Sequence, residues 1–199
     1  MTQNQADTDE PILINEPTNR EIDNKDPLPS FIDLMTNSDK SKFDEKYVNS
    51  MITHLAVGSA MAKLVTDSKD EEVRTLAKYI INKNSSTNVQ LRSWANDWNL
   101  RIEEPNNEAI NEIISNINRY DGEERDHQFT LDILDHFDGS IGMAKLATAN
   151  ANKLELKNYA NNVIEDELEQ ASNFYQWSRT VSFDNDDRFV AMHGTHDSY

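Results

Sequence analysis

Apolar residues between about residue 41 and residue 180 recur at alternating steps of three and four, the pattern of helices that pack into a bundle. Four long stretches follow this pattern, at roughly 41–66, 69–101, 123–149 and 152–180. A shorter stretch within 106–120 carries isoleucine at helical spacing and predicts a short extra helix. The pattern therefore predicts an all-α protein, built as a four-helix bundle.

Two turns divide the long stretches into helical hairpins. The sequence Ser-Lys-Asp-Glu at 68–71 has the form of a capping box, with Ser68 as the N-cap and Glu71 bonding back to it. In the second hairpin, Asn152 and Glu155 are expected to have the same roles. Each turn should thus be followed directly by the second helix of its hairpin.

The two hairpins are related by an internal repeat. Met-Ala-Lys-Leu at 61–64 recurs 82 residues later, at 143–146. At the same shift Asp44 falls on Asp126, Tyr47 on Phe129 and His54 on His136; beyond the turn the shift is 83, and Ala77 falls on Ala160, Ile81 on Ile164 and Trp94 on Trp177. The change of one residue falls in a predicted turn, where a loop tolerates it. The matches keep a fixed order, which favours duplication over chance.

These features divide the chain into five parts. Residues 1–38 are rich in Asn, Asp, Glu, Thr and Pro and are expected to be a disordered acidic tail. A first hairpin at 39–104 and a second at 123–181 are joined by a connector at 105–122, which holds the short helix. Residues 182–199 form a second polar tail.

The apolar seam of each hairpin is interrupted by polar residues at one height. His54 and His136 lie in the middle of the first helices, and each is followed on the seam by a small residue that leaves room for an imidazole, Gly58 or Ser140. Counting from the turns at 1.5 Å per residue places four polar residues of the second helices at the same height. They are Asn84, Thr87, Glu167 and Gln170.

A buried polar group without a partner costs about 1–3 kcal/mol, so this polar layer should satisfy its own groups, or bind water or a metal. Two interpretations stay open. The layer is either a hydrogen-bonded network that sets helix register or a metal or ligand site. Methionine could add soft ligands for Cu(I), although methionine at helical spacing usually fills a core. The candidates on the seams are Met51, Met61 and Met143.

A second candidate metal site lies near the C-terminus. His193 and His196 stand beside Met192 and Asp197, and two histidines with such neighbours can chelate copper or zinc weakly. Such a short segment is equally often inert.

Composition narrows the functional classes. The net charge is −17, from 36 acidic and 19 basic residues, which disfavours binding to nucleic acid or anionic lipid. No apolar run is long enough for membrane insertion, and the N-terminus lacks the basic and apolar regions of a signal peptide, so an exported form would begin after its cleavage site.

Cysteine is absent. No hydrolase, phosphate-binding or zinc-protease motif occurs, and a di-iron site would need Glu where Met51 and Ile133 stand. A non-enzymatic protein is expected, and its protein partner cannot be identified from the sequence.

The seam residues resemble those of the domain-of-unknown-function 305 family, over about 41–98 and 123–178. The matching residues are Asp44, Tyr47, Met51, His54, Met61, Ala62, Leu76, Ala77 and Trp94, and again Asp126, Phe129, His136, Gly139, Met143, Ala144, Ala160 and Trp177. The chain departs from the family where a second His is replaced by Leu55 and Phe137, and where the family's Gln and Glu become Asn84 and Thr87, then Glu167 and Gln170.

The resemblance implies a ferritin-like bundle. It also implies binding of copper through His and Met outside the cytoplasm, as in some tandem members of the family. The first hypothesis is therefore a copper-handling protein with its ion at or near His54 and His136. The alternative is a structural or interaction protein whose polar layer only sets helix register.

Overall fold

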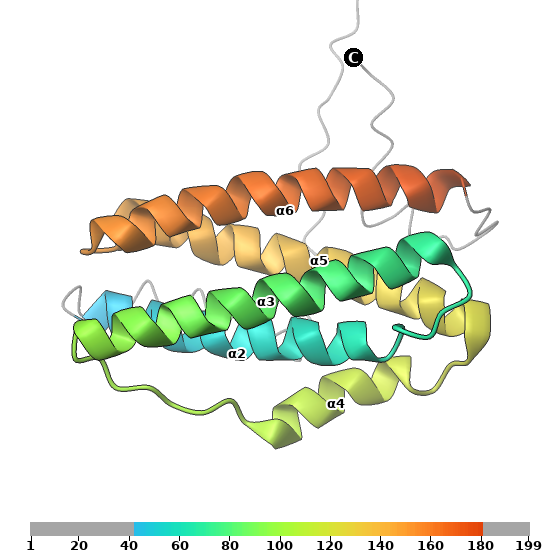
Figure 1. Cartoon of the computed structure of the whole chain (residues 1–199), viewed down its shortest axis with the longest axis horizontal. Coiled ribbons are helices and arrows are strands. Elements are labelled where there is room, and N and C mark those ends of the chain that lie inside the picture. Colours follow the sequence, from blue (N-terminus) through green and yellow to red (C-terminus); the bar gives the residue numbers. More distant parts are fainter. Residues whose placement is uncertain (1–41, 181–199) are drawn as a thin grey trace, which may run out of the picture.

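The computed structural model describes residues 42–180, and this part of the chain is helical apart from its turns and the irregular segment at 98–106 (Figure 1). The four long helices and the short one that the sequence predicts are all present. Their bounds are Phe43–Lys63 (α2), Glu71–Asp97 (α3), Asn107–Ile117 (α4), Gly122–Asn150 (α5) and Leu154–Thr180 (α6). No described helix is long and apolar enough to cross a membrane. The predicted tails, at 1–38 and 182–199, lie outside the described residues.

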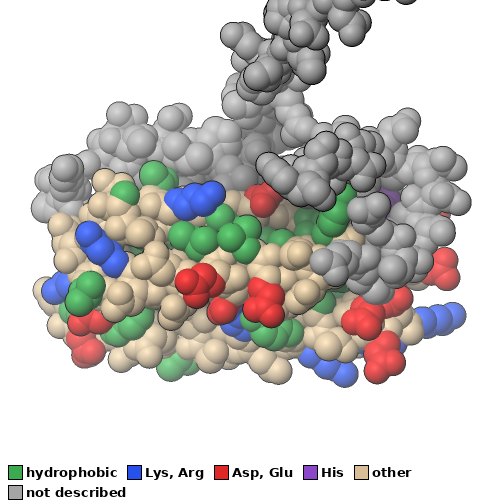
Figure 2. All heavy atoms as spheres, turned by 90° about the horizontal axis from the view of Figure 1, so that it is seen from above, with side chains coloured by type: hydrophobic (Ala, Val, Ile, Leu, Met, Phe, Trp, Pro, Cys, Tyr) green, Lys and Arg blue, Asp and Glu red, His purple; other side chains and the backbone are tan. Residues whose placement is uncertain are grey.

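The long helices form two antiparallel hairpins, α2 with α3 and α5 with α6 (Figure 1). The hairpins meet mainly through α2 and α5, which run in opposite directions. Helix α4 lies across the side of this pair and contributes the fully buried Ile117 to the core. Figure 2 shows the face that carries α6, where acidic and basic side chains are interspersed with hydrophobic ones.

The buried apolar side chains form two clusters along the bundle. One contains Tyr47, Met51 and Met143, and the other contains Met61 and Phe129. Each cluster draws residues from both hairpins, so burial of apolar surface holds the hairpins together at two levels. His54 lies on α2 between Met51 of one cluster and Met61 of the other. The polar layer therefore separates two apolar cores.

The capping prediction was wrong at the first turn. Helix α3 begins at Glu71, and its N-cap is Asp70, whose carboxylate accepts from the backbone N–H groups of Glu72 at 2.9 Å and Val73 at 3.1 Å. Ser68 instead donates to the Asp126 carboxylate at 2.5 Å. Helix α6 begins at Leu154, two residues beyond Asn152.

Two buried aspartates connect each hairpin to the turn of the other. Asp44, at the start of α2, accepts from the backbone N–H groups of Asn152 at 2.8 Å and Lys153 at 3.2 Å in the α5–α6 turn. Asp126, at the equivalent place in α5, accepts from Ser68 in the α2–α3 turn. Both carboxylates therefore have a structural role, and they fix the antiparallel alignment of α2 with α5.

Candidate functional site

The two seam histidines are in contact at the centre of the bundle. The imidazole rings of His54 on α2 and His136 on α5 are stacked, with centroids 3.5 Å apart and planes within 2° of parallel. The Nε2 atom of His54 is buried and has no hydrogen-bond partner among the described residues. The structure thus brings together the pair that counting along the helices placed at one height.

Gly58 provides the space that His136 occupies. A Cβ atom built on Gly58 would lie 2.5 Å from Nε2 of His136 and 3.1 Å from Nδ2 of Asn84. The Asn84 amide donates to the carbonyl oxygen of Leu55 at 3.1 Å. On the side of the first hairpin, His136 therefore lies against the α2 backbone at Gly58, next to the buried amide of Asn84.

The second hairpin presents a different environment at the equivalent positions. Ser140 forms a hydrogen bond with the carboxyl group of Glu167, and its hydroxyl group donates to the carbonyl oxygen of Phe137 at 2.9 Å. Burial raises the pKa of Glu167 to about 8, with Lys83 lowering it and Asp166 raising it further. At neutral pH this carboxyl group is mostly protonated. It is thus a neutral, hydrogen-bonded part of the layer.

Burial keeps both imidazoles neutral at physiological pH. It lowers the pKa of His54 to about 4, against a smaller opposing effect of the backbone of His136. Burial also lowers the pKa of His136 well below its ordinary value, and the neighbouring His54 lowers it further. Neutral imidazole is the form that carries a lone pair for a metal ion.

The stacked arrangement does not itself form a chelate. The lone pair of an imidazole nitrogen lies in the plane of its ring, and two parallel planes 3.5 Å apart cannot converge on one ion. Among the described residues no group of three or more His, Asp or Glu is arranged to hold a metal. Binding of one ion by both histidines therefore requires at least one ring to rotate.

The remaining predicted site residues are more scattered. Thr87 and Gln170 are half-buried, as are His54, His136 and Glu167, and no described hydrogen bond joins either of them to the histidine pair. Met51 and Met143 belong to one apolar cluster and Met61 to the other, so all three fill the core. His193 and His196 lie outside the described residues, and their role stays a prediction.

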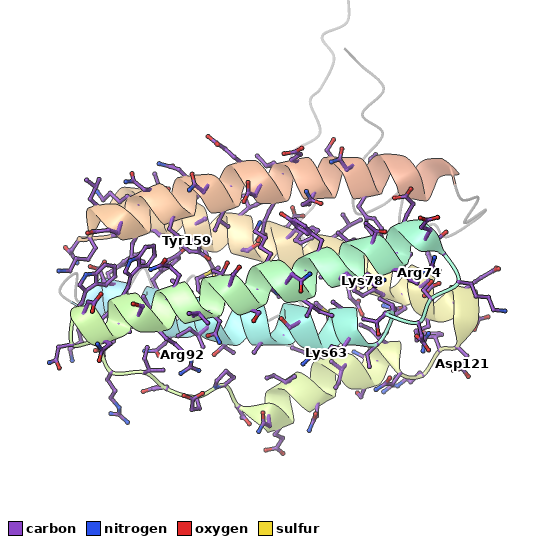
Figure 3. All side chains as sticks on the ribbon, viewed as in Figure 1. Lys63, Arg74, Lys78, Arg92, Asp121 and Tyr159 are labelled. Carbon is purple, nitrogen blue, oxygen red and sulfur yellow. The ribbon has the colours of Figure 1, made fainter. Side chains whose placement is uncertain are left out.

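An open groove of about 330 Å³ adjoins the polar layer, which the sequence did not reveal. Its walls come from α2 and α3, and Pro105 of the connector lies at its edge. Pro105 is held there because Arg92 donates two hydrogen bonds of 2.8 Å to the preceding residue, Glu104. Figure 3 shows Arg92 on the side of α3 next to the connector. No local sequence signal predicts this groove, because it depends on where the connector folds back.

Comparison with known proteins places this arrangement in context. Residues 44–178 match the family described as domain of unknown function DUF305. A DUF305 protein from Streptomyces coelicolor, described as secreted, has a similar structure, with a TM-score of 0.59 and 19% identity over 67% of this chain and 89% of that one.

The protein CopM is also similar in structure. Its Cu(I)-bound form has a TM-score of 0.59 and 15% identity, over 70% of this chain and 97% of that one. Its Cu(II)-bound form has a TM-score of 0.60 and 16% identity, over 69% and 97%. A search among curated proteins found no match. The family match spans most of the chain and both hairpins, and the chain belongs to the DUF305 family.

Proposed function

We propose that this chain is a non-enzymatic metal-binding protein of the copper-handling type, which binds its ion at His54 and His136. The observation that carries the proposal is the contact between two neutral imidazoles, one with a buried, unpaired Nε2 atom. An unpaired buried polar atom costs about 1–3 kcal/mol, and a metal ion would satisfy it.

The chemistry of the donors favours a soft or borderline ion. Imidazole suits copper and zinc, and a thioether favours Cu(I). Met51 stands one helical turn before His54 and is the nearest thioether along α2. Met61, Met143 and Glu167 are the further candidate donors. The solved CopM structures that share this fold are described as Cu(I)-, Cu(II)- and Ag-bound, which supports a copper-type cargo.

Ion binding would be coupled to a change within the layer. The rings must leave their parallel stack, so the apo arrangement competes with the metal-bound one. Protons compete as well, since a protonated imidazole cannot bind a metal. Because the pKa of His54 is about 4, this competition should begin only in distinctly acidic solution.

A second function is favoured by the bonds within the layer. Asn84 bonds to Leu55 and Ser140 bonds to Glu167, so these groups satisfy one another without any ion. On this alternative the layer only sets helix register, and the protein is a structural or interaction module. Its partner is not indicated by any described surface.

The two functions differ in metal uptake. Chelator-free protein is titrated with Cu(I), Cu(II) and Zn(II), and bound metal is measured by mass spectrometry. The His54→Gln/His136→Gln variant should lose the stoichiometric site, while His127→Gln, which changes another histidine of α5, should keep it. Circular dichroism checks that each variant is folded. No uptake by the wild type, or uptake unchanged in the double variant, would rule out this site; loss only on removing residues 190–199 would place it at His193 and His196.

The compartment is part of the same proposal. A similar DUF305 structure is described as secreted. We infer that this protein also acts outside the cytoplasm, and fractionation of the source cells with an antibody would test this.

A further inference from the structure

We propose that the groove between α2 and α3 is the route by which a metal ion reaches and leaves the histidine pair, with the Asn84 side chain as its gate. This rests on the proposed function and adds the direction and control of exchange. The groove is lined along α2 by Leu55 and Ser59 and along α3 by Asn84 and Ser85. Lys63 lies on the rim, and the charge of Arg92 is balanced by Glu104.

Asn84 stands between the groove and the pair. Its side chain lines the groove, while its Nδ2 atom and Nε2 of His136 both approach the same point beside Gly58. The residue as a whole is only 8% exposed. Since Gly58 has no side chain, the Asn84 amide is the group that fills the space between the groove floor and the imidazole.

The gate is held weakly. Among the described residues, the Asn84 amide makes one hydrogen bond, to the carbonyl oxygen of Leu55 in the helical backbone of α2. A single neutral hydrogen bond of this kind contributes about 0.5–1.5 kcal/mol net. Rotation of this side chain is therefore a small cost compared with separating the helices.

The second hairpin carries different residues at the equivalent positions. Positions 140 and 167 correspond to 58 and 84, and they hold Ser140 and Glu167, which are joined by a hydrogen bond. Both positions are buried, but Ser140 carries a side chain bonded to Glu167, whereas Gly58 has none, and His136 and Asn84 lie against it. The two hairpins thus differ at the same height, and the first one combines a glycine, a lightly held amide and a groove.

Exchange kinetics test the route separately from affinity. Ser85→Trp places a large ring in the groove at an exposed position, and Ser93→Trp is the matched control, exposed on the same helix but outside the groove. Transfer of Cu(I) to and from a competing chelator is followed by stopped-flow absorbance. Ser85→Trp should slow loading and release by about tenfold, equivalent to about 1.4 kcal/mol of barrier, with the dissociation constant unchanged. Asn84→Ala should speed both by about fivefold.

A measurement without metal keeps the two proposals distinguishable. Carbethoxylation of His54 and His136, resolved by peptide mass spectrometry, reports access to the pair. It should be slower in Ser85→Trp than in Ser93→Trp, and faster in Asn84→Ala. Equal rates of modification in both tryptophan variants would overturn the groove as the route even if copper binds. If the protein takes up no copper but carbethoxylation still depends on the groove substitutions, the proposed metal is wrong and the groove is still the access path to the histidines.

Discussion

The hollow beside Gly58 makes the substitution Gly58→Ala a sensitive probe of the histidine layer. Elsewhere in a helix this change stabilises a protein by about 0.5–1 kcal/mol, because alanine loses less backbone entropy on folding. Here the new Cβ atom would lie 2.5 Å from Nε2 of His136 and 3.1 Å from Nδ2 of Asn84. Carbon and nitrogen do not approach to 2.5 Å without a shift, and the imidazole is held by its stack on His54.

The expected size follows from these opposing effects. Inserting a methyl group into a packed core costs about 1–3 kcal/mol, and the helix preference returns part of it. The net loss should be about 1–2 kcal/mol in the free energy of unfolding. For a protein of this size that lowers Tm by about 2–8 °C.

The assay is urea and thermal unfolding followed by circular dichroism. Gly142→Ala is the matched control, because it is also within a helix and its Cβ atom would meet nothing within 4 Å. It should raise stability by about 0.5–1 kcal/mol. In a His136→Ala background, Gly58→Ala should also become neutral or stabilising. Equal effects of the two glycine variants, or a cost that persists without His136, would refute this account of the layer.

The helices were predictable because apolar periodicity reports them directly, and their ends were less so. Ser68 and Asp70 are both good N-cap residues and stand two positions apart. The choice between them depends on Asp126, which accepts from Ser68 across 58 residues of sequence. A local pattern cannot show such a partner. The same holds for Asp44, whose acceptor role in the α5–α6 turn follows only from the antiparallel packing of α2 on α5.

The height of the polar layer was predictable because helical rise is constant, so counting from each turn places His54, His136 and Asn84 together. The orientations within the layer were not. Whether two imidazoles stack or converge depends on side-chain rotamers, which helical periodicity does not determine.

The remaining predictions concern the free energy of unfolding measured in urea. Asp44→Ala removes the acceptor of two backbone amides and should cost about 1–3 kcal/mol, while Arg92→Ala, which breaks an exposed ion pair, should cost at most about 1 kcal/mol. The pKa of Glu167 is about 8 in the folded state against an ordinary 4.5. Between pH 4.5 and 8 the folded state therefore holds a proton that the unfolded state has released. The contribution of Glu167 to the free energy of unfolding thus falls as the pH rises through this range. Glu167→Gln should remove that alkaline loss. The sign is opposite for His54, whose pKa of about 4 lies below the ordinary 6.5: the unfolded state takes up the proton first, and stability falls as the pH drops from 6.5 towards 4. His54→Gln should therefore remove the loss of stability as the pH falls from 6.5 to 4, and Glu167→Gln should remove the loss as the pH rises from 4.5 to 8; where the two windows overlap, the two variants should change the slope in opposite directions. If the two variants gave the same pH profile, neither slope could be assigned to these buried groups.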